Sequence, residues 1–202
     1  MGVLADTSIL SDEFREKFAD AQMELIVPNQ KTKMTYAMRS SDSIDVSLTV
    51  GERIGYNGFF TRDYKLSDGT TVFCLEPMEN GPSSGNYRAY QSNDALLSAV
   101  MYYGYGGPGY YDTDLGMYYM FAEGARPYGY VLTHMALSYV YDGCSDDSDA
   151  FTGTNQSTVE GLKNIVAWLS NFTWSVPSNF SAFTVNTGSG TQAMGLDRKS
   201  VV

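Results

Sequence analysis

The stretch DYKLSDGTTVFCLEP, Asp63 to Pro77, consists of two extended runs joined at a Ser-Asp-Gly turn. An Asp-Gly pair provides the positive φ angles that a tight turn needs, so the stretch predicts an antiparallel β-hairpin. Cys74 is expected near the end of the second strand, because Pro77 and a loop rich in Gly, Pro and Ser follow it.

Two further patterns extend this sheet. Upstream of the hairpin, every second residue is apolar, which predicts a strand with one buried face: Ile44, Val46, Leu48 and Val50. Near the end of the chain, the runs SAFTVNT and TQAMGL flank a turn at 188–190 and are typical of short strands. The predicted β-structure therefore comes from two separate parts of the chain.

Helical spacing predominates elsewhere. Ser157 and Glu160 predict a capping box at the start of the last helix. Four helices are predicted: Ser11–Val27, a segment from Asn93 or Asp94 to the glycines after Tyr103, about 131–141, and one within Asn155–Asn171.

The order of these elements predicts an α+β fold, a β-sandwich or barrel-like sheet domain with an inserted helical subdomain. We predict one unit over residues 1–202, with the sheet at about 30–77 and 180–202. The helical insertion is expected at about 90–175.

The charge balance restricts the partners. The chain has 13 Lys and Arg against 23 Asp and Glu, a formal charge of -10, which disfavours binding to nucleic acid or to an anionic membrane. The sequence has no apolar run long enough to cross a membrane and no signal-peptide pattern at its start. The initial Met-Gly and the final DRKSVV are expected to be cuts from a longer chain.

Cys74 and His134 are the residues that suggest chemistry. An imidazole beside a cysteine can draw off its proton, and the thiolate is a nucleophile. The alternative is that Cys74 is a small buried apolar residue and His134 a core residue satisfied by a carbonyl or hydroxyl. The spacing of the two residues does not decide between these interpretations.

Four segments together resemble the thioester domains of Gram-positive surface adhesins: FCLEP, PSSGNYRAY, MYYGYGGPGYY and VLTHMALSYVYDG. The resemblance runs from about Met34 to Gly195. It implies a domain at the tip of a cell-wall-anchored protein that captures host amines covalently. In the family, a cysteine in an aromatic-Cys-aliphatic-acidic strand motif joins a glutamine in a Thr-Gln-x-Ala helix motif. Cys74 matches that cysteine.

The helix motif departs from the family pattern at its central position. Thr133 and Ala136 match, but His134 stands where the family has glutamine. An imidazole has no carboxamide carbon for a thiolate to attack, so Cys74 and His134 cannot form that thioester. Gln192, in GTQAMGL, is another glutamine, but its segment resembles the closing strand of the family more than the thioester helix.

These observations favour an adhesion domain of the bacterial cell surface, without the thioester, that binds a host or extracellular protein through the tyrosine- and glycine-rich loops near 102–111. One alternative is a Cys74–His134 dyad, with Glu76 orienting the ring, in a cysteine hydrolase or transamidase. Another is a covalent adhesin with a thioester from Cys74 to another glutamine. The resemblance predicts that the Cys74 sulfur and the His134 ring lie close together.

No metal or cofactor is predicted. The acidic loop with Asp142, Asp146, Asp147 and Asp149 lacks the glycine and terminal glutamate of an EF-hand, so a solvated loop is favoured over a calcium site. Cys144 lies in the same loop and is interpreted as a bystander or a disulfide candidate.

Overall fold

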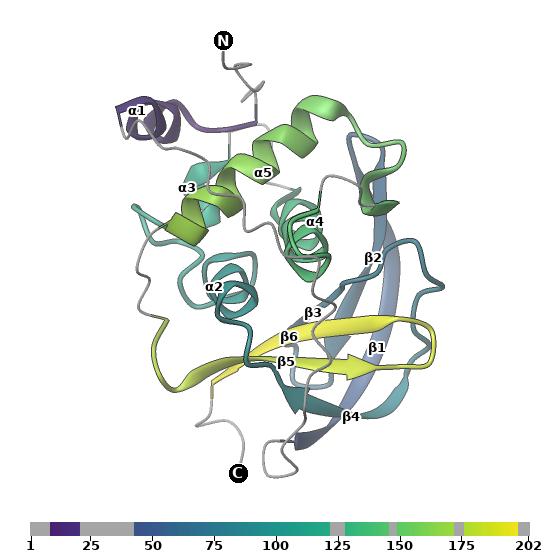
Figure 1. Ribbon diagram of the computed structural model, residues 1–202. Helices are drawn as coiled ribbons and strands as arrows, with labels where there is room; N and C mark the ends of the chain where they lie inside the picture. Colours follow the sequence, from purple (N-terminus) through teal and green to yellow (C-terminus); the bar gives the residue numbers. More distant parts are fainter. Residues whose placement is uncertain (1–8, 21–42, 122–127, 146–148, 172–175, 198–202) are drawn as a thin grey trace.

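The computed structural model describes residues 9–20, 43–121, 128–145, 149–171 and 176–197. Six antiparallel strands form a closed barrel in the order β1-β2-β3-β6-β5-β4, and helices are stacked over one side of it (Figure 1). This arrangement confirms the predicted α+β fold and shows that the sheet is a barrel and not a sandwich. The strands are β1 (Ser43–Tyr56), β2 (Phe59–Leu66), β3 (Thr71–Cys74), β4 (Gly85–Gln91), β5 (Phe180–Asn186) and β6 (Thr191–Asp197).

The predicted hairpin is present as β2 and β3. Gly69 has a φ of 89°, and the Asp68 side chain accepts a hydrogen bond from the Thr70 N–H at 2.8 Å. The two strands pair only at Tyr64↔Val72 and Lys65↔Thr71. The first half of β2 is therefore not paired with β3. Another element must fill the space between these two strands.

The other edge of β3 pairs with β6, which also pairs with β5 along its whole length. The β5–β6 turn contains Gly188 and Gly190 with φ of 77° and 108°, as a turn predicted around 188–190 requires. Strands from the two predicted parts of the sheet thus meet at β3, and closure of the barrel brings distant segments of the chain side by side.

The helices α2 (Ala95–Tyr103), α3 (Met117–Met120), α4 (Gly129–Tyr141) and α5 (Gln156–Asn171) all lie between β4 and β5 in the chain. α4 is buried at every residue from its start to Val140, because it lies between the barrel and the other helices (Figure 1). The short helix α1 (Asp12–Asp20) lies outside the insertion, beside α3 and α5.

The sequence predicted the N-terminal cap of α2 correctly and that of α5 incorrectly. Asp94 caps α2 by accepting the Leu97 N–H at 2.9 Å, as predicted. The prediction of a capping box of Ser157 and Glu160 is wrong, because Asn155 is the N-cap residue of α5. Its side chain accepts the Ser157 N–H at 3.0 Å, and its carbonyl accepts the first helical N–H groups.

Some predictions fall outside the described residues: the predicted helix beyond residue 20, the sheet segment at 30–42, and Asp146 and Asp147 of the acidic loop. Within the described ranges, every helix is too short or too polar to cross a bilayer.

Candidate functional site

Cys74 faces a glutamine across two paired strands. In the antiparallel ladder of β3 and β6, the Cα partner of Cys74 is Gln192. Side chains of directly opposed residues point to the same side of a sheet, with their Cβ atoms about 5 Å apart. The thiol and the carboxamide are thus presented to one another by the backbone register, before any side-chain rotation is considered.

The Gln192 side chain is buried without the partners that a buried amide needs. Its exposed fraction is 0 %, and within the part of the chain that the structure describes neither Nε2 nor Oε1 has a hydrogen-bond partner. Leaving a buried amide unpaired costs about 1–3 kcal/mol in mutational studies. An orphaned polar group of this kind needs an explanation, and its neighbour Cys74 supplies a chemical one.

Cys74 has a buried thiol with a raised pKa. Burial raises the pKa of the thiol, and this effect outweighs the hydrogen-bonding influence of the Glu76 backbone and of the Gln192 side chain, both of which lower it. The Gln192 side chain is therefore near enough to act on the sulfur, although it lacks regular hydrogen-bond geometry. Both side chains are shielded from water, since Cys74 is 4 % exposed and Gln192 is not exposed at all.

Glu76 connects the segment just after β3 to the first residue of β6. Its carboxylate accepts a hydrogen bond from the Thr191 N–H at 2.8 Å, and the Leu75 N–H donates to the Thr191 carbonyl at the same distance. Thr191 also receives a hydrogen bond from the Tyr141 hydroxyl of α4, at 3.3 Å. All three contacts converge on the residue directly before Gln192.

His134 contacts the backbone of Cys74 rather than standing free. Its Nδ1 and Nε2 lie 3.2 and 3.3 Å from the Thr61 hydroxyl of β2. Burial lowers the pKa of the imidazole from 6.5 to about 3, and a hydrogen bond with the Cys74 backbone opposes this only in part. The ring is therefore neutral at physiological pH, and it joins β2 to β3.

The ring of His134 also packs against Phe73, with centroids 5.9 Å apart. Neighbouring side chains on a regular strand point to opposite faces, so the side chains of Phe73 and Cys74 are expected on opposite faces of β3. The structure thus places His134 at the backbone of Cys74. Pairing of the ring with the sulfur stays a prediction.

Tyr130, one helical turn before His134, also connects β2 to β3. Its hydroxyl lies 2.7 Å from the Arg62 carbonyl oxygen and 2.9 Å from that of Val72, and it accepts the Tyr64 N–H at 3.3 Å. The Ser138 hydroxyl, one turn after His134, lies 3.3 Å from the Cys74 carbonyl oxygen. One face of α4 therefore satisfies the backbone groups left open where β2 leaves β3.

Gln192 is the residue that the sequence analysis discounted. Its assignment to a closing strand is right, since it lies in β6, but that strand pairs with the one that carries Cys74. The available signal was the position of a polar glutamine beside the apolar Ala193 and Met194 in a short strand. No local pattern shows which strand becomes its neighbour.

The tyrosine-rich loop after α2 is partly core and partly surface. Tyr103 and Tyr110 are buried, whereas Tyr105 is 39 % exposed and Tyr111 is 65 % exposed. Tyr110 and Tyr111 lie edge to face with centroids 5.0 Å apart, which holds the exposed ring in place. The loop thus presents ordered aromatic surface.

Cys144 is a buried free thiol, so it is not in a disulfide. Burial and the nearby Asp94 raise its pKa to about 11, which makes it a poor nucleophile at neutral pH.

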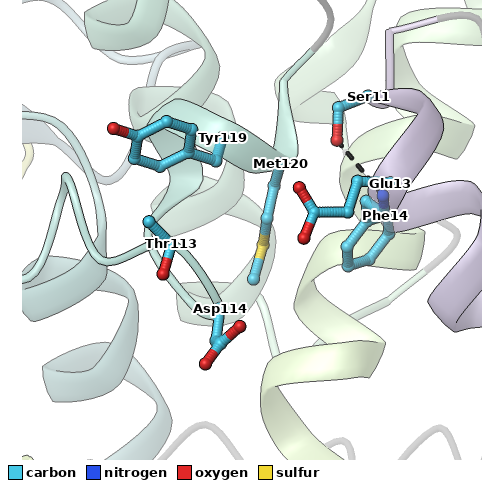
Figure 2. A pocket seen from close by; sticks show the side chains of 7 residues that line it. All are labelled: Ser11, Glu13, Phe14, Thr113, Asp114, Tyr119 and Met120. Atoms are coloured by element: carbon cyan, nitrogen blue, oxygen red, sulfur yellow. Dashed lines mark hydrogen bonds between the residues drawn. The ribbon is translucent and has the colours of Figure 1, made fainter.

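A separate pocket lies between the start of α1 on one side and α3 with the segment before it on the other (Figure 2). None of its lining residues belongs to the barrel, and none is a predicted site residue. It is lined by Ser11, Glu13, Phe14, Thr113, Asp114, Tyr119 and Met120.

Comparison with known families gives one match, to a family model described as "Thioester domain", over residues 45–176. That range is well over half of the 202-residue chain. No curated protein sequence matches the chain.

Several solved structures are similar. The N-terminal domain of the Streptococcus pyogenes pilus tip adhesin Cpa is 15 % identical, with 85 % of this chain and 99 % of that chain covered and a TM-score of 0.46. The Bacillus anthracis TIE protein is 11 % identical, with 76 % and 39 % covered and a TM-score of 0.47. The N-terminal thioester domain of a Clostridium perfringens surface protein is 14 % identical, with 75 % and 98 % covered and a TM-score of 0.44.

Proposed function

This chain belongs to the thioester domain family, and we propose that it is a covalent adhesion domain whose thioester joins the Cys74 sulfur to the side-chain carbonyl carbon of Gln192. The observation that carries the proposal is the pairing of Cys74 with Gln192 across β3 and β6, with the Gln192 amide fully buried and unpaired. This replaces the interpretation of Gln192 as a residue of the closing strand only.

Formation of the bond needs no cofactor. The Cys74 thiolate attacks the carboxamide carbon of Gln192, the C–N bond breaks, and the nitrogen leaves as ammonia with the proton from the thiol. An S–C bond replaces a C–N bond, and there is no change in oxidation state. Register holds the two groups together, which removes much of the entropic cost of the step.

Target capture reverses the exchange. A primary amine attacks the thioester carbon, an amide bond forms, the S–C bond breaks, and Cys74 recovers its proton as a thiol. Burial protects the thioester from water, because Cys74 is 4 % exposed and Gln192 is not exposed at all. The resemblance noted above suggests a lysine on a host or extracellular protein as the source of the amine, and the surface of a Gram-positive bacterium as the location.

Non-covalent recognition precedes the reaction in this proposal. Tyr105 and Tyr111 present exposed rings on an ordered loop, and tyrosine offers large contact area at a small entropic cost. These rings are proposed as part of the surface that selects the target protein.

The dyad of Cys74 and His134 receives less support. Proton transfer from a thiol with a raised pKa to an imidazole with a pKa of about 3 is strongly uphill. His134 already satisfies backbone and hydroxyl groups of two strands. These contacts support a structural function for His134.

The intact mass of the purified chain tests the proposal. The expected mass is lower than the sequence mass by one ammonia, and methylamine converts this species to an N-methyl amide on Gln192 that is heavier than the sequence mass by one CH2. Cys74→Ala and Gln192→Ala are expected to have full mass and to form no adduct. A wild-type chain with full mass and a freely alkylated Cys74 would overturn the proposal.

A further inference from the structure

We propose that Glu76 is a positioning residue that holds Gln192 opposite Cys74 through the Thr191 backbone. The inference rests on the proposed thioester between Cys74 and Gln192. It assigns Glu76 a function different from that of a group that orients an imidazole or accepts a proton.

The reactive pair lies at the very end of a ladder. Cys74 is the last residue of β3 and Gln192 is the second residue of β6, so their pair is the last rung of the β3–β6 ladder. Backbone pairing ends there because Pro77 and a loop follow β3. The ends of ladders open more readily than their centres, so this pair needs an additional restraint.

Glu76 provides that restraint with its side chain. The Leu75 N–H bonds to the Thr191 carbonyl at 2.8 Å, and the Glu76 carboxylate accepts the Thr191 N–H at 2.8 Å. A charged acceptor makes a stronger hydrogen bond than a neutral one. Thr191 is therefore held on both its N–H and its carbonyl, although the regular pairing of β3 with β6 has ended.

The neighbouring turn increases the need for this contact. Gly190, directly before Thr191, has a φ of 108°, and a Cβ placed there would lie 3.8 Å from both the Gln192 Nε2 and the Glu76 Cβ. Gly190 thus lies near both the Gln192 amide and the Glu76 side chain, at the point where the chain changes direction. Loss of the hydrogen bond would leave Thr191 and Gln192 paired with β5 but would loosen their position relative to Cys74.

Two conservative variants separate the effect of the length of the Glu76 side chain from the effect of its charge. Glu76→Gln keeps the length of the side chain and an acceptor oxygen but removes the charge. Glu76→Asp keeps the charge but is one methylene shorter and loses the reach to Thr191. A positioning residue requires that Gln preserves the function better than Asp, whereas a proton acceptor requires the reverse order.

The experiment measures two quantities on wild type, Glu76→Gln, Glu76→Asp and Glu76→Ala. The first is the fraction of chain that lacks the mass of one ammonia, together with the rate of methylamine capture. The second is the hydrogen exchange rate of the Thr191 amide. Asp45→Ala is the charge-matched control, because it removes one carboxylate from an exposed ion pair with Arg88 on the far strands β1 and β4.

We expect Glu76→Ala and Glu76→Asp to lose thioester content by about 10-fold or more and to exchange Thr191 faster, since small misplacements of reacting groups cost on this scale. Glu76→Gln and Asp45→Ala are expected to stay close to wild type in both measurements. Wild-type thioester content in Glu76→Ala would overturn the inference, as would Asp outperforming Gln. Absence of the mass deficit in wild type would instead refute the proposed function, while Thr191 exchange would still test the contact itself.

Discussion

The two edges of β3 are held by different means. On one edge, β6 places the Gln192 amide opposite Cys74, and that amide has no hydrogen bond to any residue that the structure describes. On the other edge, Tyr130, His134 and Ser138 of α4 satisfy the backbone groups of β2 and β3. The unsatisfied edge is where we propose reaction, and the satisfied edge is a support.

The single histidine of the chain, His134, lies on the supporting edge. Its ring is entirely buried and neutral, and its pKa is far from the range useful for proton transfer at neutral pH. Gln192 is not titratable, yet its burial without partners makes it the more informative residue.

The largest expected effect concerns the reactive edge. Gln192→Glu keeps the size of the side chain but cannot release ammonia, so amine capture is expected to fall to the background seen with Cys74→Ala. Methylamine labelling followed by peptide mapping measures this. A label that persists on another residue in Gln192→Glu would refute the assignment of the acyl donor.

On the supporting edge, Tyr130→Phe is expected to destabilise the fold by about 3 kcal/mol, because it leaves buried backbone groups of Arg62, Tyr64 and Val72 without a partner. Urea denaturation measures the loss. The folded fraction should retain the mass deficit of wild type. Loss of the thioester from well-folded Tyr130→Phe would mean that the two edges are not independent.

His134 introduces a pH dependence of stability. The unfolded chain binds a proton near pH 6.5 whereas the folded ring does not until about pH 3, so the free energy of unfolding should fall as pH falls through this window. The contribution of this group has a slope of up to about 1.4 kcal/mol per pH unit.

His134→Gln offers the matched variant for this slope. A carboxamide can donate to the Cys74 backbone and accept from Thr61 without titrating, so the variant should be less sensitive to acid than wild type. Denaturation curves from neutral pH to about pH 5 measure the difference. An equal slope in both chains would show that other groups dominate.

The smallest effect is expected far from both edges. Asn155→Ala removes the cap of α5 and should cost about 1 kcal/mol without changing amine capture. Thermal denaturation and the methylamine assay measure the two quantities. A change in capture would indicate that α5 contributes to the arrangement of the barrel strands.

Local patterns predicted most of the elements. The hairpin at Gly69 and the cap at Asp94 follow from backbone and hydrogen-bonding preferences that act over a few residues. α3, Met117–Met120, was missed because four residues cannot show a helical period. The cap of α5 was misplaced because Asn155 and Ser157 are both good capping residues, and the order of local contacts decides between them.

The candidate site was predicted only in part. The motif around Cys74 singled out the cysteine that we propose as the nucleophile, because its flanking residues follow a local pattern. Gln192 was discounted because strand pairing between distant segments leaves no trace in either segment alone. Glu76 was singled out for its acidity, but its contact with Thr191 depends on the same pairing.

The sequence by itself determined that the chain forms antiparallel strands around a helical insertion, and that Cys74 lies at a strand end, since periodicity and turn residues act locally. Only the tertiary structure decided which side chains meet there. Closure of the barrel sets β6 beside β3, and packing of α4 places the His134 ring at the Cys74 backbone and against Phe73. Register and packing are properties of the assembled core, so the chemistry of Cys74 is determined by contacts that no single segment encodes.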